Sequence, residues 1–344
     1  MRNATTVAVG LGLVGAVVAT VLGLLTFGAQ ATVAPDHLPL AVAVPDNPML
    51  EQAAGQIASH DGDAVEWQVT DPAHARDLLE DKQVYGVLEI NQGPAITIVT
   101  SGAVNPQGTQ VAQQVLTGAA QGLLGALAQQ QPNLQVAPPK TEMIHPVSTA
   151  GRTAPLAASA LLWIGGLVGA MAFGLLVIQR GMRATNTARV VLVVSVTVLA
   201  TGAVVGLLKL WDSSLNISAE VLGFLLLTAA AFSAVQGALL RLLRLRAAAI
   251  LGPMYLLAPA VAGTVPEMLN PTYRTLLWSW TPFRFSTEGL RSLLQGVPDA
   301  PDVRTGVVVL ASMAVVGLVV LLLPVRKDPV APAVETRELV SSGS

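Results

Sequence analysis

The sequence predicts a polytopic α-helical membrane protein: six transmembrane helices, with an α/β extracytoplasmic domain inserted between helices one and two. Three observations lead to this prediction. Hydrophobic residues make up 52% of the 344-residue chain and charged residues only 12%, about half the charged fraction of an average soluble protein. Six apolar stretches approach the roughly 20 residues with which a helix crosses a bilayer. Between the first and second of them lies a polar, acidic stretch of domain length.

Five of the six predicted spans lie in the second half of the chain, after Pro155. The spans are Thr5–Phe27, Leu156–Ile178, Val190–Leu208, Val221–Leu240, Ala247–Thr264 and Gly306–Leu323. Ala29-Gln30-Ala31 has the small-x-small form of a signal cleavage site. Thr5–Phe27 is longer than the 7–15 residues of a signal h-region, so we favour an uncleaved anchor over a cleaved signal.

The positions of Lys and Arg predict the orientation, because basic residues near membrane ends collect on the cytoplasmic side. The stretch from Ala31 to Pro155 has twelve Asp and Glu against four basic residues. The loops between spans two and three, between spans four and five, and after span six are basic: Arg180, Arg183, Arg189, Arg241, Arg244, Arg246, Arg326 and Lys327. We therefore expect a multi-pass, bacterial cell-membrane protein with both termini in the cytoplasm.

These patterns divide the chain into six parts. They are the first transmembrane helix (1–30), the extracytoplasmic α/β domain with its stalk (31–155), helices two to five (156–265), an outer re-entrant or interfacial helical hairpin (266–302), the sixth helix (303–325) and a cytoplasmic tail (326–344).

The inserted stretch reads as alternating strands and helices. Strands are predicted at His37–Pro45, Ala64–Thr70, Val84–Ile90 and Ala95–Thr100, and helices at Pro48–Ser59, Asp71–Asp81 and Pro106–Gln131. Asp71 precedes Pro72, the usual arrangement of an N-cap and a first helical residue. Pro132–Pro155 is predicted to be a stalk that leads back to the membrane.

Several classes of chemistry are excluded or disfavoured. The chain has no cysteine, so disulfides and cysteine metal sites are excluded. It has no Walker A sequence, and its four histidines lie outside the spans at spacings that do not favour metal binding. We therefore predict no catalytic, cofactor-binding or metal-binding residue, no nucleic-acid partner and no enzymatic activity.

Small and aromatic residues give predictions about packing within the membrane. Gly165 and Gly169, like Gly202 and Gly206, stand four residues apart, a spacing that lets helices approach closely. Packing inside one bundle is favoured over a dimer seam. Trp163, together with Trp211, Trp278 and Trp280, is predicted to mark the outer membrane interface.

The segment Pro266–Asp302 is too polar to span a membrane and too apolar to be a free loop. Pro271 and Pro282 should break it into short helices, with an amphipathic turn and helix from Ser286 to Gln295. Backbone at membrane depth must be helical or buried in protein. We predict a re-entrant hairpin packed on the bundle.

Two stretches of sequence resemble a known family. TPFRFSTEGLRSLLQG resembles the pattern P-x-x-(Y/F)-x-x-x-(G/A)-(L/F)-R-x-x-(L/I)-x-G, with matches at Pro282, Phe285, Gly289, Leu290, Arg291 and Gly296. VYGVLEINQGPAITIVTSGAVNP resembles a second region, which precedes the long outer helix. With the order of spans and insert, the chain is similar to membrane subunits of ABC-2-type transporters, and closer still to the YhgE/Pip (phage infection protein) group.

The resemblance leaves two functions open. One is a permease subunit that exports a hydrophobic or amphipathic substrate and is driven by a separate ATP-binding subunit. Its other candidate partners are membrane lipid and a second copy of the chain, as a homodimer. The alternative is a non-transporting envelope protein whose outer domain binds a secretion component or another partner. The candidate functional residues are Pro282, Phe285, Glu288 and Arg291, and the candidate ATPase-coupling loop contains Arg180, Arg183 and Arg189.

Overall fold

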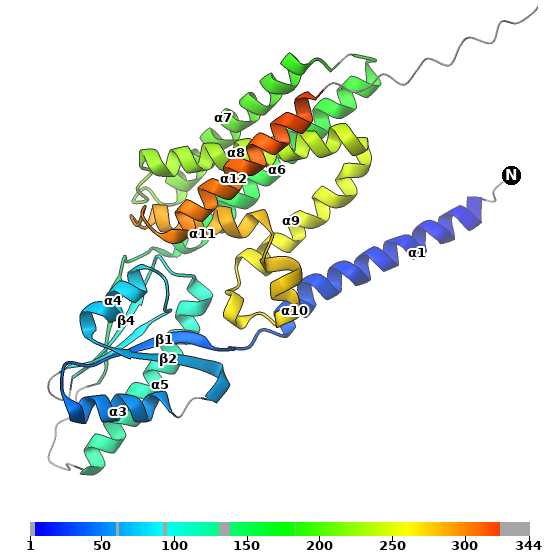
Figure 1. The fold of residues 1–344 in the computed structure, drawn as a ribbon. Helices are drawn as coiled ribbons and strands as arrows, with labels where there is room; N and C mark the ends of the chain where they lie inside the picture. Colours follow the sequence, from blue (N-terminus) through cyan, green and yellow to red (C-terminus); the bar gives the residue numbers. More distant parts are fainter. Residues whose placement is uncertain (1–3, 60–61, 92–94, 131–137, 183, 324–344) are drawn as a thin grey trace, which may run out of the picture.

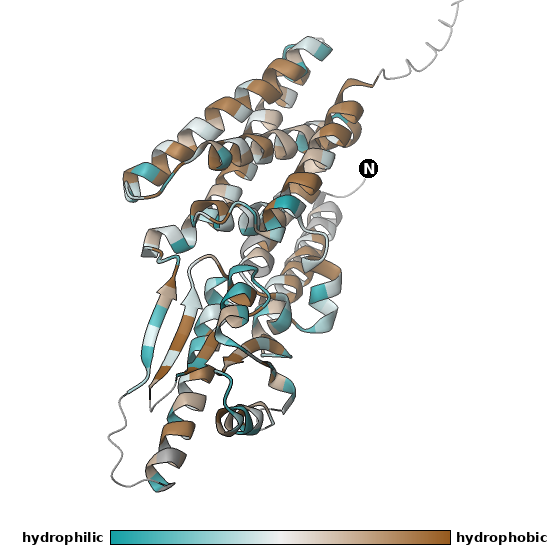
Figure 2. Ribbon diagram, turned by 60° about the vertical axis from the view of Figure 1, so that its left-hand side comes forward, coloured by the Kyte–Doolittle hydropathy of each residue, from teal (hydrophilic) through white to brown (hydrophobic). Residues whose placement is uncertain are grey.

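The computed structural model describes residues 4–59, 62–91, 95–130, 138–182 and 184–323. A sheet with its helices forms one end of the molecule, and a bundle of long helices forms the other (Figure 1). We call the first part, from β1 to β5, the α/β module. Figure 2 shows that the long helices are largely apolar, whereas polar residues are more frequent in the α/β module.

The first helix projects away from the bundle (Figure 1). It consists of α1 (Ala4–Gly23), a π-helical turn (Leu24–Gly28) and α2 (Ala29–Ala31). The Tyr273 hydroxyl donates a hydrogen bond of 2.9 Å to the carbonyl oxygen of Leu24. The amide of Ala34 donates to the carbonyl of Met268 at 3.1 Å. The end of the first helix is therefore tied to the segment that follows α9.

The α/β module contains a five-stranded mixed sheet. Its strands are β1 (Leu38–Ala43), β2 (Val65–Thr70), β3 (Val87–Ile90), β4 (Ile96–Ser101) and β5 (Lys140–Ile144), in the order β2-β1-β3-β4-β5. Only the β3–β4 pair is antiparallel. Because both faces of the central strands are covered, β1 reads as a continuous apolar run, and β3 is apolar except for Glu89, which is paired with Arg76.

Helices cover both faces of this sheet. The helices are α3 (Pro48–Ala58), α4 (Pro72–Glu80) and α5 (Pro106–Gln130). Leu40 and Leu116 belong to the core beneath α5, whereas Ala41 and Leu79 belong to the core beneath α4. The predicted cap of α4 is confirmed, because the Asp71 carboxylate accepts hydrogen bonds of 3.0 Å from the amides of Ala73 and His74.

The predicted stalk over Pro132–Pro155 is wrong from residue 138 onward; residues 132–137 lie outside the described part of the chain. Lys140–Ile144 is the edge strand β5, which pairs in parallel with β4 and completes the hydrogen bonds along that strand. The next helix, α6 (Thr149–Gln179), begins at the Ser148 cap and has Pro155 in its interior. The prolines in this stretch led to the stalk prediction, but the residues between Pro139 and Pro146 are enough to form a strand that pairs with β4.

The bundle is built from α6, α7 (Asn186–Trp211), α8 (Ala219–Leu243), α9 (Ala248–Ala262), α11 (Pro282–Leu294) and α12 (Pro301–Leu322). Helices α8 and α12 are in close contact: a Cβ at Gly317 would lie 2.7 Å from the backbone carbon of Ala234. Gly165 and Gly169 allow α6 to approach α7, facing Ala200 and Val196. For this pair the predicted intramolecular packing is confirmed.

Five helical stretches of the described chain are long and apolar enough to cross a membrane. They are Ala8–Ala31, Thr149–Gln179, Asn186–Trp211, Ala219–Leu257 and Pro301–Leu322. The predicted span Ala247–Thr264 corresponds to α9, which has 15 residues and follows α8 through the 3₁₀ turn Arg244–Ala247. Figure 1 shows α9 returning toward the α/β module.

The prediction that Trp163 marks the outer membrane interface is wrong. Only 1% of it is exposed, and its ring lies 5.0 Å from the rings of both Phe232 and Phe283. Its indole Nε1 donates to the Leu251 carbonyl at 3.3 Å. An isolated tryptophan in an apolar helix is thus placed in the bundle core, where its N–H finds a backbone acceptor.

Candidate functional site

The candidate site is centred on helix α11, which lies between the α/β module and the other helices of the bundle (Figure 1). Pro282 is at its first position, where a missing amide hydrogen costs nothing, and Gly296 has φ +75° just after its end. The predicted hairpin is thus a series of short helices: Pro266–Met268, Pro271–Tyr273, Arg274–Trp278 and α11. Most of α11 is buried, including its polar residues Thr287 and Ser292.

The residues of the resemblance motif have distinct structural roles. Pro282 begins α11 and is buried. A Cβ at Gly289 would lie 2.5 Å from the Phe224 ring, so this glycine allows α11 to approach α8. Leu290 is 1% exposed and belongs to the bundle core. Pro282, Gly289 and Leu290 therefore contribute to the start and the packing of α11.

Glu288 and Arg291 form the ion pair that their i, i+3 spacing predicts. The pair is more buried than expected: the side chain of Arg291 is 5% exposed and that of Glu288 is 25% exposed. The Asn105 amide, at the start of α5, donates to the Glu288 carboxylate at 3.3 Å. This contact connects the motif to the α/β module.

Two further polar contacts join the same surfaces. The Lys82 ammonium group lies 2.7 Å from the Asp302 carboxylate at the start of α12, and it also contacts the Ser292 hydroxyl. The Tyr85 hydroxyl donates to the Glu267 carboxylate at 2.7 Å. Lys82 has φ +59°, a conformation that is uncommon for a non-glycine residue. The turn after α4 thus holds a strained lysine against the bundle.

The electrostatic environment keeps Glu288 ionised. Burial by itself raises the pKa of Glu288, but the nearby charges of Arg291 and Lys82 and the hydrogen bonds from Arg291 and Asn105 outweigh it, so that its pKa is lowered. At Tyr85 burial is the main cause, followed by the Glu267 carboxylate, and the pKa rises well above its ordinary value of 10. Tyr85 therefore remains a hydrogen-bond donor at neutral pH.

A cavity of about 350 Å³ lies among these groups, and Glu267, Arg284, Phe285 and Asp302 contribute to its wall. The Arg284 guanidinium stacks 3.7 Å from the Trp278 ring centre and 4.2 Å from that of Phe285. Such cation–π contacts are strongest when water is excluded. The wall of this cavity combines carboxylates and cations with apolar and aromatic side chains.

The candidate coupling loop lies at the opposite end of the bundle, where α6 ends and α7 begins. Arg180 is exposed just after α6, and Arg189 lies in the first turns of α7. Arg183 lies outside the described residues, as do Arg326 and Lys327. Phe285 and Glu288 lie at the junction with the α/β module, so the structure separates the two predicted groups of residues.

Sequence reasoning missed three members of the junction: Lys82, Asn105 and Asp302. Each lies in a turn or at a helix start, where a polar residue is ordinary. The only local signal was Asn105 before Pro106, which predicts a helix start and no contact with α11. Lys82 lies 220 residues from Asp302 in the chain, and Asn105 lies 183 residues from Glu288.

Comparison with protein families matches residues 11–325 to the ABC-2 family transporter proteins. The match spans most of the chain, and the protein therefore belongs to the ABC-2 transporter family. Members of this class are membrane components of transporters driven by a separate ATP-binding subunit. The match does not single out the YhgE/Pip group. Comparisons with curated proteins and with solved structures gave no match.

Proposed function

We propose that this protein is the permease subunit of an exporter for a hydrophobic or amphipathic substrate, with the α/β module outside the membrane and a separate ATPase on the cytoplasmic side. The family match over residues 11–325 is the observation that supports it most directly. The absence of a Walker A sequence fits a permease whose ATP hydrolysis occurs on another chain.

The end of the bundle away from the α/β module is the proposed surface for the ATPase. The exposed Arg180 and Arg246 lie on two separate connections at this end. Clustered basic residues near helix ends favour a cytoplasmic location. A partner with acidic residues would be attracted to this surface and would contact the α6–α7 connection, and α6 in turn packs against α11.

The whole permease is proposed to be a homodimer. Along α1 the described side chains are largely exposed and apolar; Leu13 is 65% exposed and Val17 is 61% exposed. No atom lies within 4 Å of the place that a Cβ would occupy at Gly12, so this face of α1 is open to a neighbouring helix. A small-residue face on a membrane helix favours association with another helix.

Co-purification from membranes, followed by ATPase assays in proteoliposomes, tests the proposed function. We expect a nucleotide-binding protein to co-purify with the chain and to lose this association when Arg180 and Arg246 are both changed to Glu. A double change of the outward Lys140 and Arg152 to Glu is the matched control and should leave the association intact. Purification of the chain with no ATPase under mild conditions would contradict the proposal and favour the envelope-protein alternative.

A further inference from the structure

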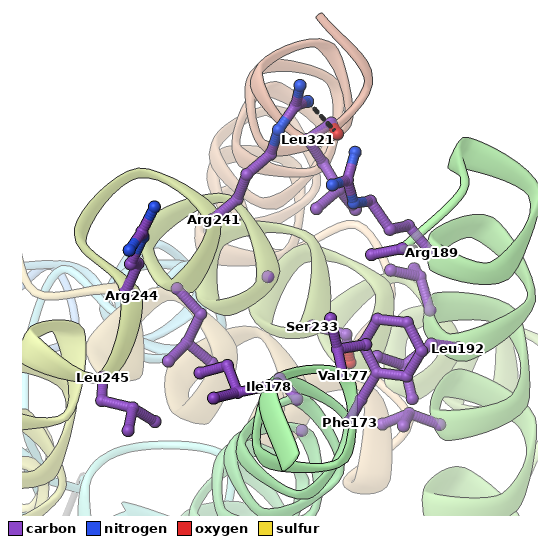
Figure 3. A pocket seen from close by; sticks show the side chains of 18 residues that line it. Phe173, Val177, Ile178, Arg189, Leu192, Ser233, Arg241, Arg244, Leu245 and Leu321 are labelled. Atoms are coloured by element: carbon purple, nitrogen blue, oxygen red, sulfur yellow. Dashed lines mark hydrogen bonds between the residues drawn. The ribbon is translucent and has the colours of Figure 1, made fainter. Parts of the chain in front are cut away.

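A second cavity, of about 540 Å³, lies between α6, α7 and α8 at the end of the bundle away from the α/β module. Its wall is mainly apolar, with Phe173, Val177 and Leu192 among the lining side chains (Figure 3). Gly174 also lines it, and no atom lies within 4 Å of the position of a Cβ there. The volume falls within the range of about 300–1,000 Å³ that is typical of ligand sites.

The mainly apolar wall of this cavity includes the buried hydroxyl group of Ser233. Ser233 lines the cavity and is only 4% exposed, yet its hydroxyl has no hydrogen-bond partner. Most buried polar groups in proteins are paired, so the unpaired hydroxyl of Ser233 is an exception in a mainly apolar wall.

Three arginines surround the mouth of the cavity: Arg189, Arg241 and Arg244 (Figure 3). Arg241 donates to carbonyls at the end of α12, including that of Val320 at 3.0 Å. Arg189 donates to the Asn186 side chain at 3.0 Å. None of the three has a carboxylate partner among the ion pairs of the described residues.

The backbone at the mouth is strained at Arg244, which has φ +54° and ψ −142°. This region of conformational space is essentially restricted to glycine. A glycine would relieve the strain, but the chain has an arginine there, with its side chain at the cavity. Strain at such a position points to a role for the side chain in binding.

We propose that this cavity binds an anionic phospholipid of the cytoplasmic leaflet, with its phosphate at the arginines and an acyl chain between α6, α7 and α8. Basic pockets between membrane helices on this side are suited to anionic headgroups. The apolar wall favours a ligand with an acyl chain, and the arginines favour a negative charge. A lipid has both, whereas a free phosphate ion has only the charge. The lipid would connect the α6–α7 and α8–α9 turns. This inference does not depend on the exported substrate.

Native mass spectrometry of the full-length protein in neutral detergent tests the proposal with three probes: phosphatidylglycerol, phosphatidylcholine with the same acyl chains, and inorganic phosphate. We expect saturable binding of phosphatidylglycerol, at least about ten times tighter than that of phosphatidylcholine. Inorganic phosphate should not compete at concentrations that leave the lipid bound. Equal binding of the two lipids, displacement by phosphate, or no binding of phosphatidylglycerol would each overturn the proposal.

Two pairs of variants locate the site. Arg244→Gly removes a charge and relieves strain, so the protein should fold while its affinity for phosphatidylglycerol falls about five-fold. Arg246→Gln, which removes an exposed charge on the same turn away from the cavity, should change the affinity less than two-fold. Gly174→Leu fills the cavity and should abolish binding. Gly202→Leu, at another open helical position, should not. Binding that survives Gly174→Leu, or that falls equally in both arginine variants, would contradict the assignment.

Discussion

Arg291 shows how much of the motif's role is structural. Its side chain is 5% exposed and is paired with Glu288, so Arg291→Ala leaves a carboxylate in a poorly solvated place. Removing one partner of a buried pair costs about 3–5 kcal/mol, and we expect the lower end because Glu288 retains some solvent contact. Thermal unfolding in detergent measures the effect. Arg304→Ala, at an exposed arginine on α12, is the control and should have little effect.

Reversing the pair tests whether its interaction is local. Glu288→Arg combined with Arg291→Glu restores opposite charges on one helix face. We expect recovery of only part of the unfolding temperature lost in each single variant, because the charge of Lys82 acts on position 288 and would repel the new arginine. Full recovery would contradict a role for Lys82, and no recovery would contradict the local pair. Adding Lys82→Ala to the reversed pair should improve its stability.

The lowered pKa of Glu288 predicts a dependence of stability on pH. A carboxyl group whose pKa is lower in the folded protein stabilises the fold above its unfolded pKa, and this contribution is lost as pH falls through the folded pKa. The ordinary value is 4.5, so the loss lies below about pH 4.5. We expect the unfolding temperature of the natural protein to fall more steeply there than that of Glu288→Gln. Parallel curves would contradict the assignment.

At the scale of elements, the contact between Lys82 and Asp302 is expected to couple the α/β module to α12. Neither side chain is fully exposed, at 13% and 23%. Hydrogen bonds to charged groups contribute about 1.5–3 kcal/mol. A double-mutant cycle with Lys82→Ala and Asp302→Ala should give a coupling energy of about 1 kcal/mol or more. Lys140→Ala, on the exposed edge strand, is the control. Additive effects of the two changes would contradict the coupling.

The contact between α8 and α12 depends on Gly317. A Cβ there would lie 2.7 Å from the Ala234 carbonyl carbon and 2.8 Å from the Val235 nitrogen, and backbone atoms cannot move aside independently of their helix. We expect Gly317→Val to destabilise the bundle by at least about 1–3 kcal/mol, measured by thermal unfolding. Gly223→Val, on a side of α8 with open space, should be close to neutral. Equal effects would contradict close α8–α12 packing.

The elements that sequence predicted best are those with strong local signals. Asp71 and Pro72 fix the start of α4, the apolar run predicted as a strand at His37–Pro45 contains β1, and the alternation in Ala64–Thr70 corresponds to β2. Strand β5 was missed because it has no such signal: Lys140–Ile144 is an edge strand that depends on pairing with β4. Trp163 was misassigned because its environment is set by Phe232 and Phe283 on two other helices.

In the candidate site, too, contacts with a local sequence signal were predicted and contacts between distant parts of the chain were not. The i, i+3 spacing of Glu288 and Arg291 predicts their pairing, and the pair is present. The partners Asn105 and Lys82 come from another part of the chain, so no local pattern could predict their contact with α11. Burial of the pair depends on how the α/β module sits against the bundle, a property of the whole molecule.

At the scale of the whole molecule, the prediction is six crossings with both ends of the chain in the cytoplasm. The chain has no cysteine, so single introduced cysteines report their side of the membrane without background. Gln113 is exposed on α5 and is a suitable position for a reporter on the α/β module.

Cysteines at Gln113 and Asn216 should react with a membrane-impermeant maleimide on intact cells, whereas cysteines at Met182 and Arg246 should react only after permeabilisation. Met182 lies in the α6–α7 turn and Arg246 in the α8–α9 turn. These turns lie at one end of the bundle and the α/β module at the other (Figure 1), so they should be on opposite sides of the bilayer. A cysteine at Thr272 tests whether α9 crosses the membrane. It should react from outside if α9 returns across the membrane. Reaction of Thr272 only after permeabilisation would mean that α9 does not cross, leaving five spans.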